Sequence, residues 1–288
     1  MSALSPSEHD MDAAERQAVL RARHAELFKP FYESHWRAIV WLILASGLFF
    51  YGLSSLEITV ARIFGGIGQL GKMVVLMLPP DAGRFSFYVY AMLETLAIAL
   101  LGTLSAAVVA FPLGFLAARN TTINKIVQFS ARRSFDTLRG VDILIWALIW
   151  INVVGLGPFA GVLALFMSDL GSFGKLFSEA IEAADNKPVE GVVSTGGTST
   201  ASVRFGILPQ LMPVLLSQVL YQFESNTRSA SIIGIVGAGG IGLILSEQIR
   251  TLELQQMSCV ILMILLTVSV IDYFCSKLRF AIIGKGAL

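Results

Sequence analysis

The chain has 288 residues, of which 55% are hydrophobic and only 14% are charged, and its formal net charge is +1. Soluble globular chains carry about 25% charged residues, so this deficit and a mean hydropathy of +0.72 argue against a soluble protein. The composition favours one bundle of membrane-spanning helices, because charge in hydrocarbon is costly. With no basic stripe, nucleic acid is excluded as an expected partner.

The first 36 residues are expected to form a polar, amphipathic tail (1–36). The segment SEHDMDAAERQAVLRARHAELF is helix-prone but lacks the apolar core of a signal peptide. The first spanning helix is therefore expected to direct its own insertion. The three histidines, His9, His24 and His35, lie in or beside this tail and away from any expected site.

Six apolar stretches approach the roughly 20 residues that a membrane span needs. They lie at about 37–56, 88–116, 141–154, 159–177, from 207 onward, and 257–274. The third stretch stops at GLGP (155–158), a glycine and proline breaker. The stretch 58–78 is amphipathic and carries Arg62 and Lys72, so it predicts an interfacial helix, with a seventh span as the alternative.

Lysine and arginine concentrate before the first span, between the second and third, after the fourth, and after the sixth. The other connections are poorer in both residues. Because cytoplasmic loops carry the excess of basic residues, six spans with both termini in the cytoplasm fit this distribution. A seventh span would put the N-terminal tail and the later basic loops on opposite sides of the membrane.

The run VGAGGIG (236–242) contains G-x-G-x-x-G, which is the fingerprint of dinucleotide-binding folds. Apolar β-branched residues precede it and a helix-like stretch follows. That fold also needs an acidic residue about 20 positions further on, and the residue found there is Leu262, inside an apolar stretch. The glycines are therefore expected to permit an outer turn and close helix packing. They are Gly237, Gly239, Gly240 and Gly242.

A polar segment, Glu179 to Arg204, interrupts the second half of the chain on the expected cytoplasmic side. Pro188 can open a short helix with Asp185 or Asn186 as its cap. Gly196 and Gly197 allow a sharp turn after it, and the residues 198–202 can cap the next helix. The segment is either a solvated loop or a docking element for a cytoplasmic motor.

The spacing in this segment resembles the EAA loop of the integral-membrane subunits of ABC importers. In that loop E-A-A is followed by three residues, Gly, nine residues and Ile-x-Leu-Pro. Here the matching positions are Glu190, Gly191, Val192, Gly196, Gly206, Leu208 and Pro209. Two alanines and the isoleucine of the pattern are replaced by Gly191, Val192 and Gly206. The literal EAA at 182–184 does not keep the spacing.

Other stretches are similar to the phosphonate ABC-transporter permeases: GLGPFAGVLALF (155–166), PVEG (188–191), LPQLMP (208–213), FESNTRSA (223–230) and VGAGGIG (236–242). The resemblance implies an all-α, polytopic helix bundle with about six transmembrane helices and a type I ABC importer permease core. The implied organisation is a tail (1–36), a first transmembrane and interfacial helix (37–87), and a permease core (88–280) with a coupling loop (183–206).

The resemblance also implies the partners. They are a second copy of the chain in a homodimer, two ABC ATPase subunits, a periplasmic phosphonate-binding protein, a phosphonate-type anion and the lipid bilayer of the inner membrane. No catalytic residue, metal or cofactor is expected in this chain, which lacks G-x-x-x-x-G-K-[ST]; ATP and Mg would bind to the ATPase.

The fifth span carries the polar run Glu224, Ser225, Asn226, Arg228 and Ser229. Glu224 and Arg228 are spaced i, i+4 and can pair on one face. At 1.5 Å per residue, Glu224 is expected on the order of 22 Å beyond Pro209, inside the hydrocarbon or near its outer edge. Intramembrane charge usually faces a water-filled path or a bundle interior. The run is therefore interpreted as the lining of a pathway in which Arg228 attracts an oxyanion, or as a structural ion pair that locks the fifth span to a neighbouring helix. Asp169, in the fourth span, is a weaker candidate for the same pathway, because its carboxylate would repel an anion. The alternative is a polar residue that helps helices to pack.

Three alternatives remain open from the sequence. They are an ABC permease for another small solute such as methionine, a stand-alone secondary transporter, and a membrane-bound oxidoreductase that uses GAGGIG. The FESNTRSA run argues against the first, the EAA-like loop against the second, and the missing βαβ pattern against the third.

Overall fold

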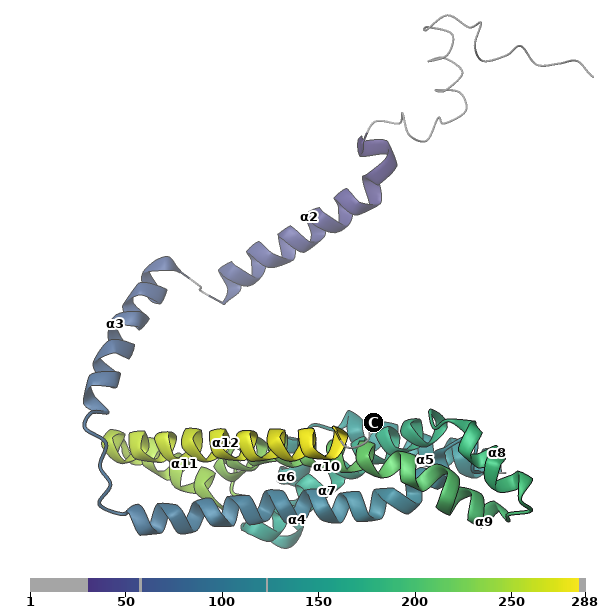
Figure 1. Cartoon of the computed structure of the whole chain (residues 1–288). Coiled ribbons are helices and arrows are strands. Elements are labelled where there is room, and N and C mark those ends of the chain that lie inside the picture. The colour runs from purple at the N-terminus through teal and green to yellow at the C-terminus, as the bar shows by residue number, and fades with distance from the viewer. Residues whose placement is uncertain (1–30, 57–58, 123, 285–288) are drawn as a thin grey trace, which may run out of the picture. The chain divides into compact units, whose positions relative to one another are not determined.

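The computed structural model describes residues 31–56, 59–122 and 124–284 (Figure 1). Across these residues the chain forms helices joined by turns, with no β-strand. It divides into two compact units, Met1–Lys72 and Met73–Leu288. The predicted tail, 1–36, falls almost wholly outside the described residues.

The first unit holds α2 (Phe31–Ser55) and most of α3 (Val60–Leu76). The candidate span in α2, Ala38–Ser55, is apolar on all sides, as a helix surrounded by hydrocarbon must be. Helix α3 coincides with the predicted helix at 58–78, and Arg62 and Lys72 lie on it. Its position at the membrane interface stays a prediction.

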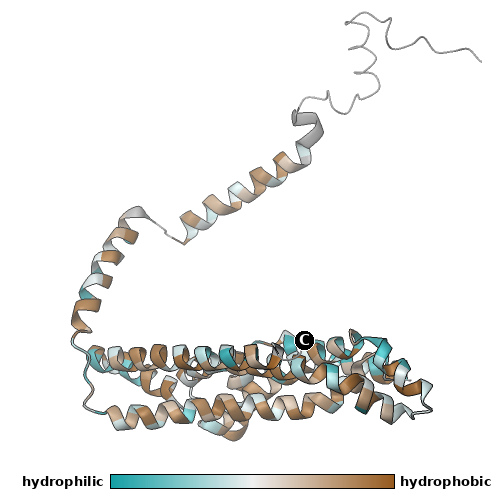
Figure 2. Cartoon of the chain, viewed as in Figure 1, coloured by the Kyte–Doolittle hydropathy of each residue, from teal (hydrophilic) through white to brown (hydrophobic). Residues whose placement is uncertain are grey.

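Four long helices form the second unit: α4 (Phe85–Ala117), α7 (Pro158–Glu182), α10 (Leu208–Ile235) and α12 (Leu254–Ile283). Together with α2 they are the five described helices long and apolar enough to cross a membrane. Figure 2 shows hydrophobic residues along these helices and hydrophilic ones gathered toward one end of the unit. The apolar stretches of the sequence therefore predict these five elements correctly.

The third predicted span is the element that differs. The predicted stretch, 141–154, corresponds to α6 (Ile143–Val154), and α5 (Lys125–Gly140) precedes it at a bend of 91°. Helix α6 has 12 residues and is about 18 Å long, too short to cross a hydrocarbon core of about 30 Å. A sixth crossing therefore requires the bent pair as a whole. The break has a local cause, since the Asp142 carboxylate caps α6 by accepting from the Leu144 amide at 2.8 Å.

Small residues let the long helices approach closely. A Cβ placed on Gly102 of α4 would lie 2.6 Å from the Leu165 Cβ of α7, and one on Gly114 would lie 3.1 Å from the Phe177 Cβ. Ala99, together with other alanines of α4, is fully buried. Helices in membranes associate through such close packing, because lipid supplies no hydrophobic driving force between them.

The two ends of the second unit carry different elements (Figure 1). At one end lie α8 (Asn186–Ser194), the short α9 (Ser199–Ala201) and a π-helical stretch, η2 (Ser202–Ile207), which leads into α10. At the other end lies α11 (Ile241–Thr251), between α10 and α12. These are named here the α8 end and the α11 end. The sequence indicates only a helix-like stretch at α11 and does not resolve α5 as a helix.

Candidate functional site

Helix α8 is built by local capping. Its first turn is capped by the Asp185 carboxylate, which accepts from the Lys187 amide at 3.1 Å, and Pro188 follows in the same turn. Gly196 turns the chain with φ of +80°, a conformation that favours glycine. Thr198 then caps α9 by accepting from the Ala201 amide. The short helix, its cap and the sharp turn agree with the sequence prediction.

The inner face of α8 is fixed to the start of α10. Gln210 accepts from the Asp185 amide and donates to the Asp185 carbonyl, both at 3.1 Å. A Cβ on Gly206 would lie 3.0 Å from the Val189 Cα. Val189 therefore fills the space of the side chain that Gly206 lacks, which explains the glycine where the EAA pattern has isoleucine.

The outer face of α8 is open. Glu190, Gly191 and Gly196 are exposed, and Val193 is 57% exposed, whereas Val192 is partly covered. Leu208 and Pro209 lie beside this element in the first turn of α10. By contrast, Glu182 of the literal EAA ends α7 and is bonded to Arg132 and to the Arg119 amide. The structure thus places the predicted coupling residues together at the α8 end, on one short exposed helix and its flanking turns.

The glycine turn (Val236–Gly240) follows α10 at the α11 end. Gly237, Gly239 and Gly240 have φ of +107°, +82° and +72°, in the left-handed region that L side chains rarely adopt. The Gly157 amide donates to the Gly237 carbonyl at 3.0 Å, so this turn is joined to the GLGP turn before α7. A Cβ on Gly242 would collide with the Ser231 carbonyl oxygen and lie 2.9 Å from the Gly234 Cα. These glycines are required by backbone conformation and by helix packing, with no strand beside them in the described chain.

Two side chains of α4 cap α11 from outside. The Gly240 amide donates to Glu94 Oε1 at 3.2 Å, and the Ile241 amide donates to Thr95 Oγ1 at 2.8 Å. Gly240 has no side chain to do this, so the first amides of α11 are satisfied by residues 146 positions earlier. Sequence reasoning did not select Glu94 or Thr95, since no local pattern marks a cap supplied from another helix.

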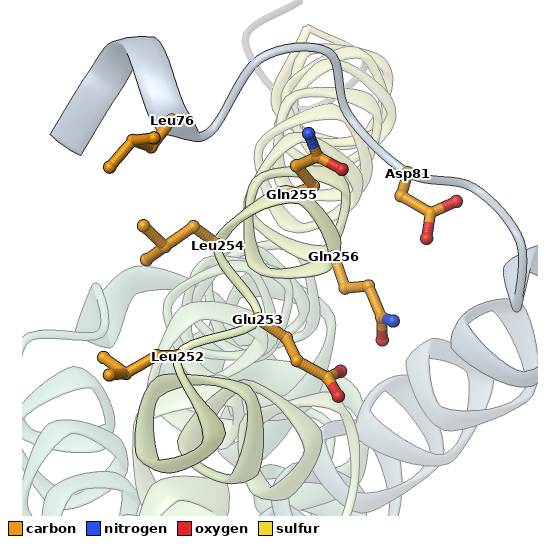
Figure 3. Close-up of a pocket in the computed structure, with 7 residues that line it drawn as sticks. All are labelled: Leu76, Asp81, Leu252, Glu253, Leu254, Gln255 and Gln256. Atoms are coloured by element: carbon orange, nitrogen blue, oxygen red, sulfur yellow. The ribbon is translucent and has the colours of Figure 1, made fainter. Parts of the chain in front are cut away.

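A cavity of about 490 Å³ lies at the α11 end, between the segment before α4 and the corner from α11 to α12 (Figure 3). Leu76, Leu252 and Leu254 extend to one side of the ribbon, and Glu253 and Gln256 to the other. Leu252 ends α11 with φ of +59° and is 76% exposed. This corner therefore presents both apolar side chains and carboxylates at the surface of the unit.

A buried polar cluster joins three long helices. Asp169 of α7 is 1% exposed, and its carboxylate accepts from the amide groups of Gln222 and Asn226 on α10. Asn226 also donates to Thr103 Oγ1 of α4 at 2.8 Å. Asn226 and Asp169 thus hold α4, α7 and α10 together, and neither side chain lies on an open surface.

Charged residues on another face of α10 pair with α12. Glu224 accepts from Arg279, and Arg228 donates to both oxygens of Asp272 at 3.3 and 3.4 Å. The two residues therefore do not pair with each other within α10. Each pairs with α12 instead, as in the alternative of a structural ion pair between the fifth span and a neighbouring helix. The hydroxyl of Ser229 donates to the Ser225 carbonyl at 3.4 Å.

The depth of Glu224 in the membrane stays a prediction. Its partner Arg279 lies four residues before the end of α12 at Ile283.

Five described helices long and apolar enough to cross a membrane, with paired charges between them, are the architecture of a polytopic membrane protein. The family described as the binding-protein-dependent transport system inner membrane component matches residues 110–278, and the chain belongs to this family. The family match covers α5 to α11 in full, including the glycine turn, and most of α12.

Two relatives cover most of the chain. It is 39% identical over 227 residues to the putative phosphite transport system permease protein HtxC of Stutzerimonas stutzeri, over 79% of this chain and 80% of that protein. It is 32% identical over 268 residues to the phosphite transport system permease protein PtxC of the same species. That alignment covers 91% of this chain and 96% of PtxC. The predicted membership of an ABC-transporter permease family is confirmed.

The fold also matches a solved transporter. An inward-facing conformation of the MetNI methionine ABC transporter superposes with a TM-score of 0.61 at 19% identity, over 70% of this chain and 99% of that chain. At this identity the match shows the fold alone. The predicted all-α, type I ABC importer permease architecture is therefore confirmed.

Proposed function

We propose that the chain is the membrane-spanning half of an ATP-driven importer that carries phosphonate or a related phosphorus oxyanion, such as phosphite, across the inner membrane. The observation that carries this proposal is the exposed helix α8 in the register of the EAA loop, in a chain similar to phosphite permeases over most of its length. Two copies of the chain would form the pathway, and energy would come from two separate ATPase subunits.

Helix α8 is the proposed receiver of that energy. Glu190, Gly191 and Val192 lie on it, and Gly196 ends it with a turn. Its inner face is held against η2 through Val189, and Asp185 before it is bonded to Gln210 of α10, so a pull on its outer face would be passed to the membrane helix. ATP shifts the conformational equilibrium only if it favours one state over the other, and contacts of Glu190 with the ATPase would carry that preference. This chain itself would bind no cofactor, since ATP and Mg belong to the ATPase.

The proposed pathway runs along the charged face of α10. The side chain of Arg228 is 48% exposed although it lies on a membrane helix. An arginine turned to hydrocarbon is costly, so this surface is better covered by a second copy of the chain or by water. Glu224, Ser225 and Ser229 accompany Arg228 in the proposed pathway. Asn226 is left out of it, because its side chain is buried against Asp169 and Thr103.

The glycine turn is proposed to act as the outer gate. In a six-crossing topology, with α5 and α6 counted as one crossing, both termini and α8 would lie in the cytoplasm and α11 outside. A periplasmic binding protein that delivers the anion would then meet the α11 end and its cavity (Figure 3). Gly239 packs against Pro158, with a virtual Cβ 2.9 Å from its nitrogen. Gly239→Leu would therefore prevent closure and abolish uptake.

The test is co-purification from native membranes in mild detergent, with the partners identified by mass spectrometry. The tagged chain should retain a second copy of itself and an ATPase, and Glu190→Arg should lose the ATPase. Glu247→Arg is the matched control, since Glu247 is exposed at the α11 end and should leave ATPase retention intact. A chain that purifies without an ATPase under every nucleotide condition would contradict the proposal.

Transport itself is measured in proteoliposomes that contain the complex, the binding protein and internal ATP. Uptake of phosphite or methylphosphonate that depends on ATP is the expected result. Uptake of methionine in place of these anions would refute the proposed substrate class while leaving the importer mechanism in place.

A further inference from the structure

The two ion pairs between α10 and α12 differ in how firmly they are held. The side chains of Glu224 and Arg279 are 14% and 25% exposed, whereas those of Arg228 and Asp272 are 48% and 38% exposed. Within the proposed water-filled pathway, water would screen the more exposed pair, and screened ion pairs contribute little. The Glu224–Arg279 pair is therefore the firmer link between the two helices, and the Arg228–Asp272 pair is the looser one.

The geometry of the looser pair leaves much of the guanidinium unused. Both bonds to Asp272 are donated by a single nitrogen, Nη1, and they are 3.3 and 3.4 Å long. A strong arginine–oxyanion contact uses two nitrogens in parallel, at about 2.7–2.9 Å. A phosphorus oxyanion can therefore offer Arg228 a better contact than Asp272 does.

We propose that Asp272 is a competing carboxylate for the oxyanion site at Arg228. In the resting permease the Asp272 carboxylate accepts hydrogen bonds from the Arg228 guanidinium. During transport the phosphorus oxyanion takes the place of this carboxylate. This inference rests on the proposed function, since it assigns Arg228 to the pathway. Asp272 and Arg279 both lie on α12, outside the polar run of α10 that the sequence analysis selects.

Competition of this kind suits a transporter. A lone arginine beside a water-filled path would hold a multiply charged anion too tightly, and transport requires binding weak enough for release. After the anion has left, Asp272 returns to Arg228, so the charge of the guanidinium is never left without a partner. Meanwhile the Glu224–Arg279 pair keeps α10 and α12 together, about one helical turn away.

The test titrates anions onto the purified complex of permease and ATPase in detergent, without the binding protein. Its thermal unfolding temperature is followed against the concentration of methylphosphonate, phosphite or inorganic phosphate, with chloride as the reference anion. Asp272→Asn should lower the half-saturating concentration by about fivefold, the equivalent of losing one weak ion pair. Asp272→Glu keeps the competing charge and should not lower it.

The matched control is Asp136→Asn. Asp136 of α5 is another partly exposed carboxylate, and it accepts from Lys175 Nζ at 3.1 Å, but it lies away from α10. This variant should leave the half-saturating concentration unchanged. Arg228→Gln should abolish the anion response, and so should the double variant with Asp272→Asn.

The outcomes separate the two proposals. If proteoliposomes take up none of the three anions, the proposed substrate class fails. If uptake occurs but Asp272→Asn leaves the half-saturating concentration unchanged or raises it, or if the wild-type complex does not respond to any anion, the competing carboxylate is overturned and the importer stands. Should Asp272→Asn not fold, Asp272→Ser replaces it with the same expectation.

Discussion

The two faces of α10 use polar residues in opposite ways. On one face, Asn226 is bonded to α4 and α7, and Gly234 packs directly against Gly242. On the other, Glu224 and Arg228 pair with α12, and Arg228 stays half exposed. On the first face the helices are closely packed and the Asn226 amide is already bonded to Thr103 and Asp169. On the second face Arg228 can exchange Asp272 for another anion. A single helix can thus be anchored along one side and carry movable charge along the other.

The largest effect is expected where α10 packs against the first turn of α11. A Cβ at Gly242 would collide with the Ser231 carbonyl, so Gly242→Ala should destabilise the folded permease by about 3 kcal/mol. Gly140→Ala is the control, because a Cβ at Gly140 meets nothing within 4 Å. Denaturant titration in detergent measures both. Equal stability of the two variants would show that the anchored face is looser than its packing indicates.

The second prediction concerns the buried cluster. Asn226→Leu removes two donated bonds and leaves Asp169 with Gln222 as its remaining amide partner, so it should cost about 2 kcal/mol of unfolding free energy. The double variant Asn226→Leu/Asp169→Leu should cost less than the sum of the single variants, since it leaves no unpaired carboxylate. Strict additivity would mean that the two residues do not act as one cluster.

The sequence predicts the long helices and the capping of α8, but it does not predict the contacts between helices. Hydropathy predicts α4, α7, α10 and α12, because a span needs a long apolar run whatever it packs against. The capping of α8 is also local, since Asp185 and Pro188 lie within its first residues. These elements were predicted because their causes lie within a few residues.

The remaining features depend on partners far along the chain. Thr95 caps α11 across 146 positions, and Arg228 finds Asp272 across 44. An i, i+4 rule favours Glu224 with Arg228, yet α12 supplies better-placed partners for both. The third span differs from its prediction in length, since the apolar run at 143–154 is too short to cross alone and can cross only together with α5.

The smallest effect is expected on the movable face, at its firmer ion pair. Glu224→Gln keeps a hydrogen-bond acceptor for Arg279 and removes only the charge, so the cost should be about 1 kcal/mol. Arg279 Nε is buried and has no hydrogen-bond partner among the described residues. The stability of this buried guanidinium therefore depends on its bond to residue 224. Removing both charges in Glu224→Gln/Arg279→Gln should restore part of the loss, because an uncompensated charge costs more than an absent pair.

A double-mutant cycle measured by denaturant titration gives the coupling free energy of Glu224 with Arg279, which should exceed that of Arg228 with Asp272. If the two couplings are equal, the pairs are held alike, and the distinction between a firm and a displaceable partner on α10 disappears.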